Sequence, residues 1–300
     1  MLANYESKNQ LKDKLNSLHF FEGNITIEDL KGGMSYATYL ISDKKNKFVA
    51  KIGKSLVDFR DNPLHQIEAN KAANIANITP KMIYSEEGIL IFEFIKSKIL
   101  TAKEIRQEDI LKKVISLIKI VHEEVNNYFN GPTSTSWYFS SITDSIKILK
   151  NKKSSYSKKL DKFIEDYKII KKAIGFHKVV FTHNDLVGNN ILNDGKKLWL
   201  IDWEFSGYNF AILDLANLSK NNQFNEEEDN FMLSEYFKNT ISLSLRYNFQ
   251  ALKCAALLRE IMWSLRAEMK SKKDFDYKSY TDKIFTRYTK QLNYFKILNI

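Results

Sequence analysis

The sequence predicts an α+β fold in which a small β-rich N-terminal lobe, residues 1–97, precedes a larger and mostly helical C-terminal lobe, residues 98–300. Three observations support this prediction. Apolar and polar residues alternate as in strands in several segments before residue 95. From Glu104 onward, apolar residues recur at helical spacing. The chain also holds only three prolines and ten glycines, which suits a structure dominated by helices.

Segments of the N-terminal lobe are predicted to be strands because they alternate or are rich in β-branched and aromatic residues. They are residues 24–30, 36–41, 48–52, 81–84 and 88–95. The second and third should form an antiparallel pair, and the last is apolar enough for a buried central strand. Pro63 begins a helical pattern that continues to about Asn77.

The C-terminal lobe is predicted to be built from amphipathic helices. The first keeps an apolar face from Ile110 to Val121 and ends near His122. Three later helices are expected at about residues 226–240, 249–270 and 277–295. These helices would supply the scaffold of the larger lobe.

The formal charge of +10 and the pI near 9.3 raise the question of a nucleic-acid or membrane-surface partner. The lysines are spread along the whole chain and interleaved with acidic residues, so a solvated surface explains the charge better. We therefore expect no nucleic-acid partner, although the excess charge would help to attract an anionic nucleotide.

The single cysteine, Cys254, lies in the apolar run 251–258 and excludes an intrachain disulfide. It is expected in the core of a protein from a reducing compartment. No segment approaches the roughly 20 apolar residues that span a bilayer. We expect a cytoplasmic monomer or homodimer that does not insert into membranes.

Two polar segments carry the parts that phosphoryl transfer requires. The first is 181–192, which contains Asp185 and Asn190, and the second is 200–204, which contains Asp202. A carboxylate must orient the attacking hydroxyl, a role that fits Asp185. Magnesium prefers carboxylate and amide oxygens, which Asp202 and Asn190 offer.

The turn signal Asn193-Asp-Gly195 separates two β-rich pieces, so a hairpin should bring Asn190 and Asp202 to the same end. His183 would brace the loop. A single aspartate beside a strand end is more often a turn residue or a helix cap. The combination with Glu204 and the other polar residues favours an active site.

The two segments resemble the protein-kinase signature His-Arg-Asp, Asn and Asp-Phe-Gly, with Asn184 in place of the Arg and Trp203-Glu204 in place of Phe-Gly. They are most similar to the choline/ethanolamine kinase family, relatives of the aminoglycoside phosphotransferases. The resemblance implies a two-lobed protein-kinase-like fold, ATP and Mg²⁺ as cofactors, and transfer of the γ-phosphoryl group to choline to give phosphocholine. Ethanolamine is the second choice of acceptor.

The resemblance also implies a nucleotide site in the N-terminal lobe. Its glycine turn would cover the phosphates, although a Gly-Gly pair alone is usually only a hairpin turn. Lys51, in the pattern Phe-Val-Ala-Lys, would bind the α- and β-phosphates and pair with an acidic residue. The site residues implied are Gly32, Gly33, Ser35, Lys51, its partner Glu68, and Glu93 and Ile95 at the adenine edge.

An aromatic pocket for the acceptor is implied as well, because aromatic faces attract a quaternary ammonium. The residues carried over are Glu204, Phe205, Trp263 and Tyr280, with Asp214 bracing the catalytic loop. Such aromatic residues on amphipathic helices are as often core residues.

The chain departs from the family pattern at two pocket positions. Asn221 replaces a residue that is usually acidic, and Glu260 replaces a residue that is usually Trp. We therefore expect Glu260 to supply the carboxylate for the acceptor's cation.

Other functions of the same fold stay open at this point. A thiamine or aminoglycoside kinase would share the phosphotransfer core. A catalytically silent nucleotide-binding regulator would usually have lost the Asp, Asn or Lys of that core, and this chain keeps all three. A basic nucleic-acid-binding protein lacks any recognisable motif here.

Overall fold

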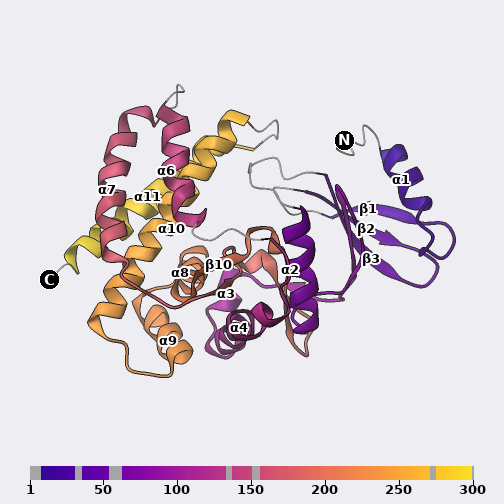
Figure 1. Ribbon diagram of the computed structural model, residues 1–300, viewed down its shortest axis with the longest axis horizontal. Helices are drawn as coiled ribbons and strands as arrows, with labels where there is room; N and C mark the ends of the chain where they lie inside the picture. Colours follow the sequence, from indigo (N-terminus) through magenta and orange to yellow (C-terminus); the bar gives the residue numbers. More distant parts are fainter. Residues whose placement is uncertain are drawn as a thin grey trace.

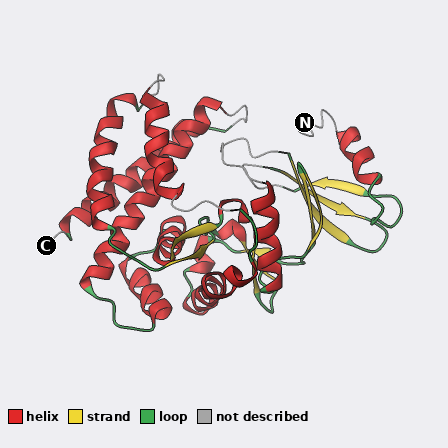
Figure 2. Cartoon of the chain, viewed as in Figure 1, coloured by secondary structure: helices red, strands yellow, loops and turns green. Residues whose placement is uncertain are grey.

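The computed structural model describes residues 8–30, 36–53, 63–132, 137–150, 156–270 and 275–298. Over these residues it has a small antiparallel sheet at one end and a helical majority at the other, which confirms the predicted fold class (Figures 1 and 2). The chain leaves the first sheet after Glu93 and enters the larger part at Lys98. The lobe boundary at residues 97 and 98 stays a prediction.

The N-terminal sheet has five strands in the order β1-β2-β3-β5-β4, and all its neighbours are antiparallel. The strands are β1 (Thr26–Asp29), β2 (Ala37–Ser42), β3 (Lys47–Ile52), β4 (Met82–Glu86) and β5 (Ile89–Glu93). Each coincides with a predicted segment, and the expected pairing of residues 36–41 with 48–52 is the β2–β3 ladder. Strand β5, which was expected to be central, lies between β3 and β4.

The two faces of β3 serve different purposes because side chains alternate along a strand. Phe48, Ala50 and Ile52 are buried in a small core with Leu11 and Leu15 of helix α1 (Lys8–Asn16). Lys51 therefore projects from the opposite face, where it reaches Asp202 of the larger lobe. Helix α2 (Pro63–Ile75) lies between the sheet and the rest of the larger lobe (Figure 1).

Helix α2 belongs to the larger lobe by its packing. Its alanines Ala69, Ala72 and Ala73 are fully buried in the main hydrophobic core, which is separate from the core of the sheet. Small side chains at this face let the helix approach its neighbours closely. The N-terminal sheet and α2 are thus held by two different cores.

The larger lobe is mostly helical, as predicted. Helix α10 lies at its centre and contacts α6, α7, α8 and α11. The helices are α3 (Ala102–Ile105), α4 (Glu108–Ile120), a π-helical turn (Val121–Val125), α5 (Asn126–Tyr128), α6 (Trp137–Lys150), α7 (Leu160–Ala173), α8 (Ala211–Asn222), α9 (Glu226–Phe237), α10 (Leu243–Lys270) and α11 (Tyr277–Ile297). Cys254 of α10 is fully buried, as expected of a core residue.

Two short sheets place the polar segments of the larger lobe. Strands β8 (Ile191–Asn193) and β9 (Leu198–Leu200) form the predicted hairpin, and β6 (Lys98–Ile99) pairs with β8. Strands β7 (Val179–Thr182) and β10 (Gly207–Phe210) pair antiparallel. The loop after β7 and the segment before β10 consequently lie side by side.

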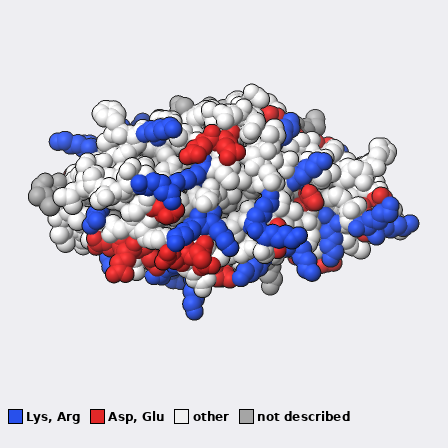
Figure 3. Space-filling view, turned by 90° about the horizontal axis from the view of Figure 1, so that it is seen from below, with Lys and Arg blue, Asp and Glu red and all other residues white. Residues whose placement is uncertain are grey.

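Charged side chains of both signs lie on the face of the molecule that Figure 3 shows. On the face in Figure 3, lysine and arginine side chains are distributed over both ends of the molecule, with acidic side chains among them. Among the described residues, no helix has the length and apolar character needed to cross a membrane.

A buried ion pair joins two helices of the larger lobe. Lys253 Nζ of α10 lies 2.6 Å from Asp229 Oδ2 of α9, and both side chains are buried. Burial raises the pKa of Asp229, while Lys253 opposes this shift. The Ser219 hydroxyl of α8 donates a second hydrogen bond to Asp229. Removal of one partner would leave the other charge buried without compensation.

We expect Lys253→Met to lower the free energy of unfolding by about 3 kcal/mol, because Asp229 would lose its counter-charge in the core. The double variant Lys253→Met, Asp229→Leu should regain most of this loss. Urea unfolding followed by circular dichroism measures both. Lys278→Met, in the exposed pair with Asp282, is the control and should leave the midpoint unchanged. A single variant as stable as the parent would contradict the expectation.

Candidate active site

The catalytic-loop candidate is held by one buried carboxylate. Asp214, on the first turn of α8, is fully buried. Its Oδ2 accepts the backbone N–H of His183 at 2.7 Å, and its Oδ1 accepts that of Asn184 at 2.7 Å. Nε2 of His122 donates to Oδ2 at 3.1 Å. The structure thus places Asp214 where the predicted bracing residue should lie.

The backbone conformation of Asn184 depends on these contacts. Its φ of +63° is in the left-handed region, which non-glycine residues adopt at a cost. The side-chain amide of Asn184 also donates to the Phe205 carbonyl at 3.0 Å. Nε2 of His183 donates to the Ile201 carbonyl at 3.0 Å, and its ring packs against Trp203. The loop is therefore tied both to α8 and to the segment after β9.

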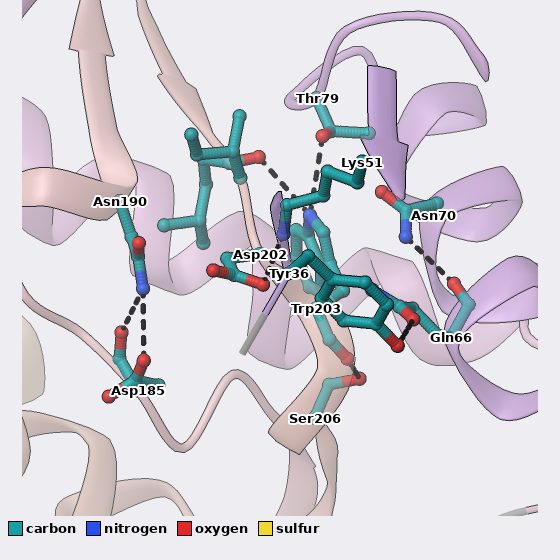
Figure 4. A network of polar contacts seen from close by, with 12 residues as sticks. Tyr36, Lys51, Gln66, Asn70, Thr79, Asp185, Asn190, Asp202, Trp203 and Ser206 are labelled. Atoms are coloured by element: carbon teal, nitrogen blue, oxygen red, sulfur yellow. Dashed lines mark hydrogen bonds and ion pairs between the residues drawn. The ribbon is translucent and has the colours of Figure 1, made fainter. Parts of the chain in front are cut away.

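Asp185 and Asn190 are in direct contact. The side-chain amide of Asn190 donates to Asp185 Oδ2 at 3.1 Å and to the Asp185 carbonyl at 3.0 Å (Figure 4). The Asn190 amide oxygen is turned away from Asp185 in this view. The backbone N–H of Ile201 donates to the Asn190 carbonyl at 2.9 Å, which fixes Asn190 beside the residue that precedes Asp202.

Asp202 meets Lys51 across the two lobes. Lys51 Nζ lies 2.6 Å from Asp202 Oδ1, and the Tyr36 ring lies 5.5 Å from the ammonium (Figure 4). Asp202 adopts the left-handed conformation, with φ of +73°, immediately after the apolar stretch of β9. The short side chain of aspartate tolerates this conformation, and the turn directs its carboxylate toward β3.

Burial and neighbouring charges shift the pKa values of Lys51 and Asp185 in opposite directions. Burial lowers the pKa of Lys51, but the carboxylates of Asp202, Glu204 and Asp185 outweigh it, so the pKa is raised. Burial also raises the pKa of Asp185, and the nearby Asp202 adds to this shift. His183, Arg259 and Lys220 act in the opposite direction on Asp185. A carboxyl group with a raised pKa is a better proton acceptor than an exposed one.

The expected pair between Lys51 and Glu68 is replaced by other contacts. Glu68 Oε1 accepts from Lys71 Nζ at 2.8 Å on the surface of α2. Gln66, whose Oε1 accepts from the Tyr36 hydroxyl at 3.1 Å, faces the site instead. Two positions along a helix correspond to about 200° of rotation, so Glu68 and Gln66 lie on opposite sides of α2. Helical phase is the reason that the prediction for Glu68 was wrong.

Of the other residues predicted for the nucleotide site, some lie outside the described residues and two lie between the lobes. Gly32, Gly33 and Ser35 lie outside the described residues. Glu93 ends β5, and its N–H donates to the Lys81 carbonyl at 2.9 Å. Ile95 lies in the connection to β6, where its carbonyl accepts from the Ser97 hydroxyl. Both residues therefore lie in the segment that joins the two lobes.

Glu260 is already bound within the protein. Lys220 Nζ lies 2.5 Å from Glu260 Oε2, and the Tyr280 hydroxyl donates to Oε1. Burial raises the pKa of Glu260, but Lys220 outweighs it and the pKa is lowered. The structure thus corrects the expectation that this carboxylate is held for the cation of an acceptor. An internal lysine, 40 positions away in sequence, takes that place.

The other residues predicted for the acceptor pocket contact one another or the residues around Asp185 and Glu260. Trp263 packs edge-on against Tyr280 with ring centroids 6.2 Å apart. The Asn221 side chain donates to the Leu186 carbonyl at 2.8 Å, next to Asp185. Phe205 lies 5.5 Å from the guanidinium of Arg259.

Sequence reasoning missed three residues of this region, Arg259, Lys220 and Tyr138. A signal for the first was present. Arg259 and Glu260 are adjacent charged residues within an otherwise apolar stretch of α10. Lys220 and Tyr138 carried no comparable signal, because each lies in a segment of mixed polarity.

We expect Asp185→Asn to raise the thermal unfolding midpoint by about 2 °C at pH 7.5, because it removes a half-buried charge whose ionised form burial disfavours. The folded-state pKa of Asp185 lies above the ordinary 3.8, so the ionised carboxylate lowers stability above that pKa. This loss disappears as the pH falls through it, and the gain should therefore shrink toward pH 4.

Thermal scans of both proteins from pH 4 to pH 8 measure the difference. The control is Asp161→Asn, at an exposed residue of α7 that pairs with Lys150, and its midpoint should follow the parent at every pH. An Asp185→Asn protein that is less stable than the parent at pH 7.5 would be evidence against a destabilising charge.

Comparisons with known proteins identify relatives of the chain. The chain is 24% identical over 255 residues to Protein LicA of Haemophilus influenzae, covering 80% of this chain and 72% of that protein. It is 24% identical over 314 residues to the probable ethanolamine kinase A of Dictyostelium discoideum, covering 92% and 88%.

Solved structures share the fold at low sequence identity. The structure of the choline kinase LicA from Streptococcus pneumoniae matches with a TM-score of 0.78 at 20% identity, covering 95% of this chain and 98% of that one. A LicA complex with AMP matches with a TM-score of 0.74 at 20% identity, covering 96% and 98%. The family model for choline/ethanolamine kinase matches residues 27–289. The chain therefore belongs to the choline/ethanolamine kinase family.

Proposed function

We propose that this chain is an ATP-dependent, magnesium-requiring kinase that transfers the γ-phosphoryl group to the hydroxyl of choline, with ethanolamine as the second candidate acceptor. One observation carries the proposal. Asp185, Asn190, Asp202 and Lys51, which come from three separate segments, meet at one place between the lobes. Phosphoryl transfer depends on positioning and charge stabilisation by groups of these kinds.

Asp185 is the residue to receive the acceptor's proton. It is half-buried, held by the Asn190 amide, and preceded by a backbone that Asp214 fixes. Burial raises its pKa, which makes the carboxylate a stronger base for the hydroxyl. A base with fixed geometry also avoids reorganisation during the reaction.

Asn190 and Asp202 would hold the magnesium ion. Their amide and carboxylate oxygens are hard donors, and one or two such groups are the usual protein share of a magnesium site whose other ligands are phosphates. When bound, the ion would offset negative charge on the phosphates. Lys51 would bind the phosphates through its ammonium, which pairs with Asp202 in this structure. The LicA complex with AMP supports a nucleotide in this fold.

The acceptor class rests on the aromatic residues near Asp185. Phe205, Trp263 and Tyr280 are aromatic residues of the kind whose faces attract an ammonium group, and the Phe205 ring already carries the guanidinium of Arg259. Choline is fully methylated and depends on such faces, whereas ethanolamine also donates hydrogen bonds. Thiamine and aminoglycosides are the alternatives within the same chemistry, and a silent nucleotide-binding regulator is the alternative outside it.

A coupled ADP-release assay over choline, ethanolamine, thiamine and kanamycin tests the proposal. We expect turnover of choline, and more slowly of ethanolamine, that disappears when EDTA removes the magnesium. Asp185→Asn should lower kcat by about 10³-fold, within the range for loss of a general base, and should leave the KM for ATP within about threefold of the parent.

Lys278→Met serves as the matched control and should retain parental kcat. If none of the four acceptors is phosphorylated by a protein that binds ATP, the proposal is wrong and the regulatory alternative gains support. If Asp185→Asn turns over choline as fast as the parent, Asp185 is not the base.

A further inference from the structure

A cation of the protein itself occupies aromatic faces beside the candidate catalytic residue. The guanidinium carbon of Arg259 lies 4.6 Å from the ring centroid of Tyr138 and 5.5 Å from that of Phe205. Both distances are within the range of a cation–π interaction. Arg259 projects from the central helix α10 and is half-buried.

The two rings are held in place by contacts to the catalytic loop. The Tyr138 hydroxyl donates to Asn217 Oδ1 at 2.9 Å, and the Asn217 side chain reaches the Asn184 carbonyl at 3.5 Å. The Asn184 side chain in turn donates to the Phe205 carbonyl at 3.0 Å. Both rings are therefore positioned through Asn184, the residue immediately before Asp185.

Arg259 is connected to the catalytic candidate through Phe205. The centroid of the Phe205 ring lies 5.5 Å from the guanidinium carbon, and the Phe205 carbonyl accepts from the side chain of Asn184, the residue before Asp185. The positive charge of Arg259 also opposes the rise in the pKa of Asp185. A quaternary ammonium that brings its hydroxyl to Asp185 would seek the same surroundings, because it is also attracted by aromatic faces and a carboxylate. Two cations cannot share these faces without like-charge repulsion.

Tyr280 and Glu260, two other residues expected to bind an ammonium acceptor, are bound to partners within the protein. Tyr280 donates to Glu260, and Glu260 is paired with Lys220 at 2.5 Å. Lys220 adds a second positive charge that acts on Asp185. An incoming ammonium would therefore meet a Glu260 carboxylate that is already paired and a guanidinium that lies on Phe205.

We propose that Arg259 is a specificity-determining residue: its guanidinium packs on the fully buried Tyr138 ring and on the half-buried Phe205 ring, and its positive charge opposes a quaternary ammonium acceptor at the Phe205 face. The inference rests on the proposed function and concerns the affinity of the same site. The parent enzyme should consequently discriminate weakly between choline and 3,3-dimethylbutan-1-ol, the uncharged alcohol of the same shape. Removal of the guanidinium charge should restore a preference for the cation.

The test compares Arg259→Met with the parent on both alcohols. Methionine keeps an extended apolar side chain against Tyr138 but carries no charge. We expect the KM and the calorimetric Kd for choline to fall about tenfold, the change that loss of a 1.4 kcal/mol competition produces. The values for 3,3-dimethylbutan-1-ol should change less than about threefold, and kcat should stay within about threefold. Arg259→Lys keeps the charge and should resemble the parent.

Two further variants control for structure. Arg246→Met removes an arginine of the same helix that lies 13 positions before Arg259 and pairs with Glu226, and it should change the values for neither alcohol. Arg259→Gln repeats the neutral substitution if Arg259→Met unfolds at a lower temperature than the parent.

Unchanged or weaker choline binding in both neutral variants would overturn the proposal. So would equal gains for the two alcohols, which would indicate relief of crowding rather than of charge. A large loss of kcat on both would assign Arg259 to phosphoryl transfer instead. Calorimetry distinguishes failure of the Arg259 inference from failure of the proposed kinase activity. Tighter choline binding without turnover would support the inference and contradict the kinase activity.

Discussion

The buried carboxylate of Asp214 is the contact on which the rest of the site depends. A carboxylate with no exposure to solvent must be satisfied by donors inside the protein. Three donors from two segments supply them, namely His122 after α4 and the backbone N–H groups of His183 and Asn184 after β7. The position of Asp214 on the first turn of α8, where the helix dipole favours negative charge, adds to this stabilisation.

The same contacts hold Asn184 in its left-handed conformation, and that conformation directs the chain so that Asp185 meets Asn190. The loop is also packed tightly. At Gly188, a side chain of any kind would be blocked, since a Cβ atom there would lie 2.5 Å from the Leu100 carbonyl oxygen. The catalytic candidates are thus positioned by backbone geometry rather than by long flexible side chains.

The sequence was sufficient for the fold class, the strand segments and the catalytic hairpin. Alternating polarity, the Asn193-Asp-Gly195 turn and helical spacing are local properties, and the structure bears them out. The predictions that were wrong concern the ion-pair partners of the site residues. Glu68 was assigned by its place along α2, but helical phase turns it away from Lys51.

Partners from distant segments have no local signature. Nothing in the sequence around Glu260 indicates that Lys220 of another helix pairs with it. In the same way, the contact of Arg259 with Tyr138 joins α10 to α6, over 100 positions apart. Local rules gave candidate residues for the site, whereas the pairing of their charges required the packed helices.

A common pattern connects these pairings. Asp202 is paired with Lys51, Glu260 with Lys220, and Asp185 lies beside the Asn190 amide and within reach of the Arg259 charge. Because burial makes an uncompensated carboxylate costly, internal cations keep the acids in place before any ligand arrives. Binding of metal, nucleotide phosphates or an ammonium then becomes an exchange of partners. The affinity of each ligand is consequently set by the difference between its own interaction and the internal contact that it replaces.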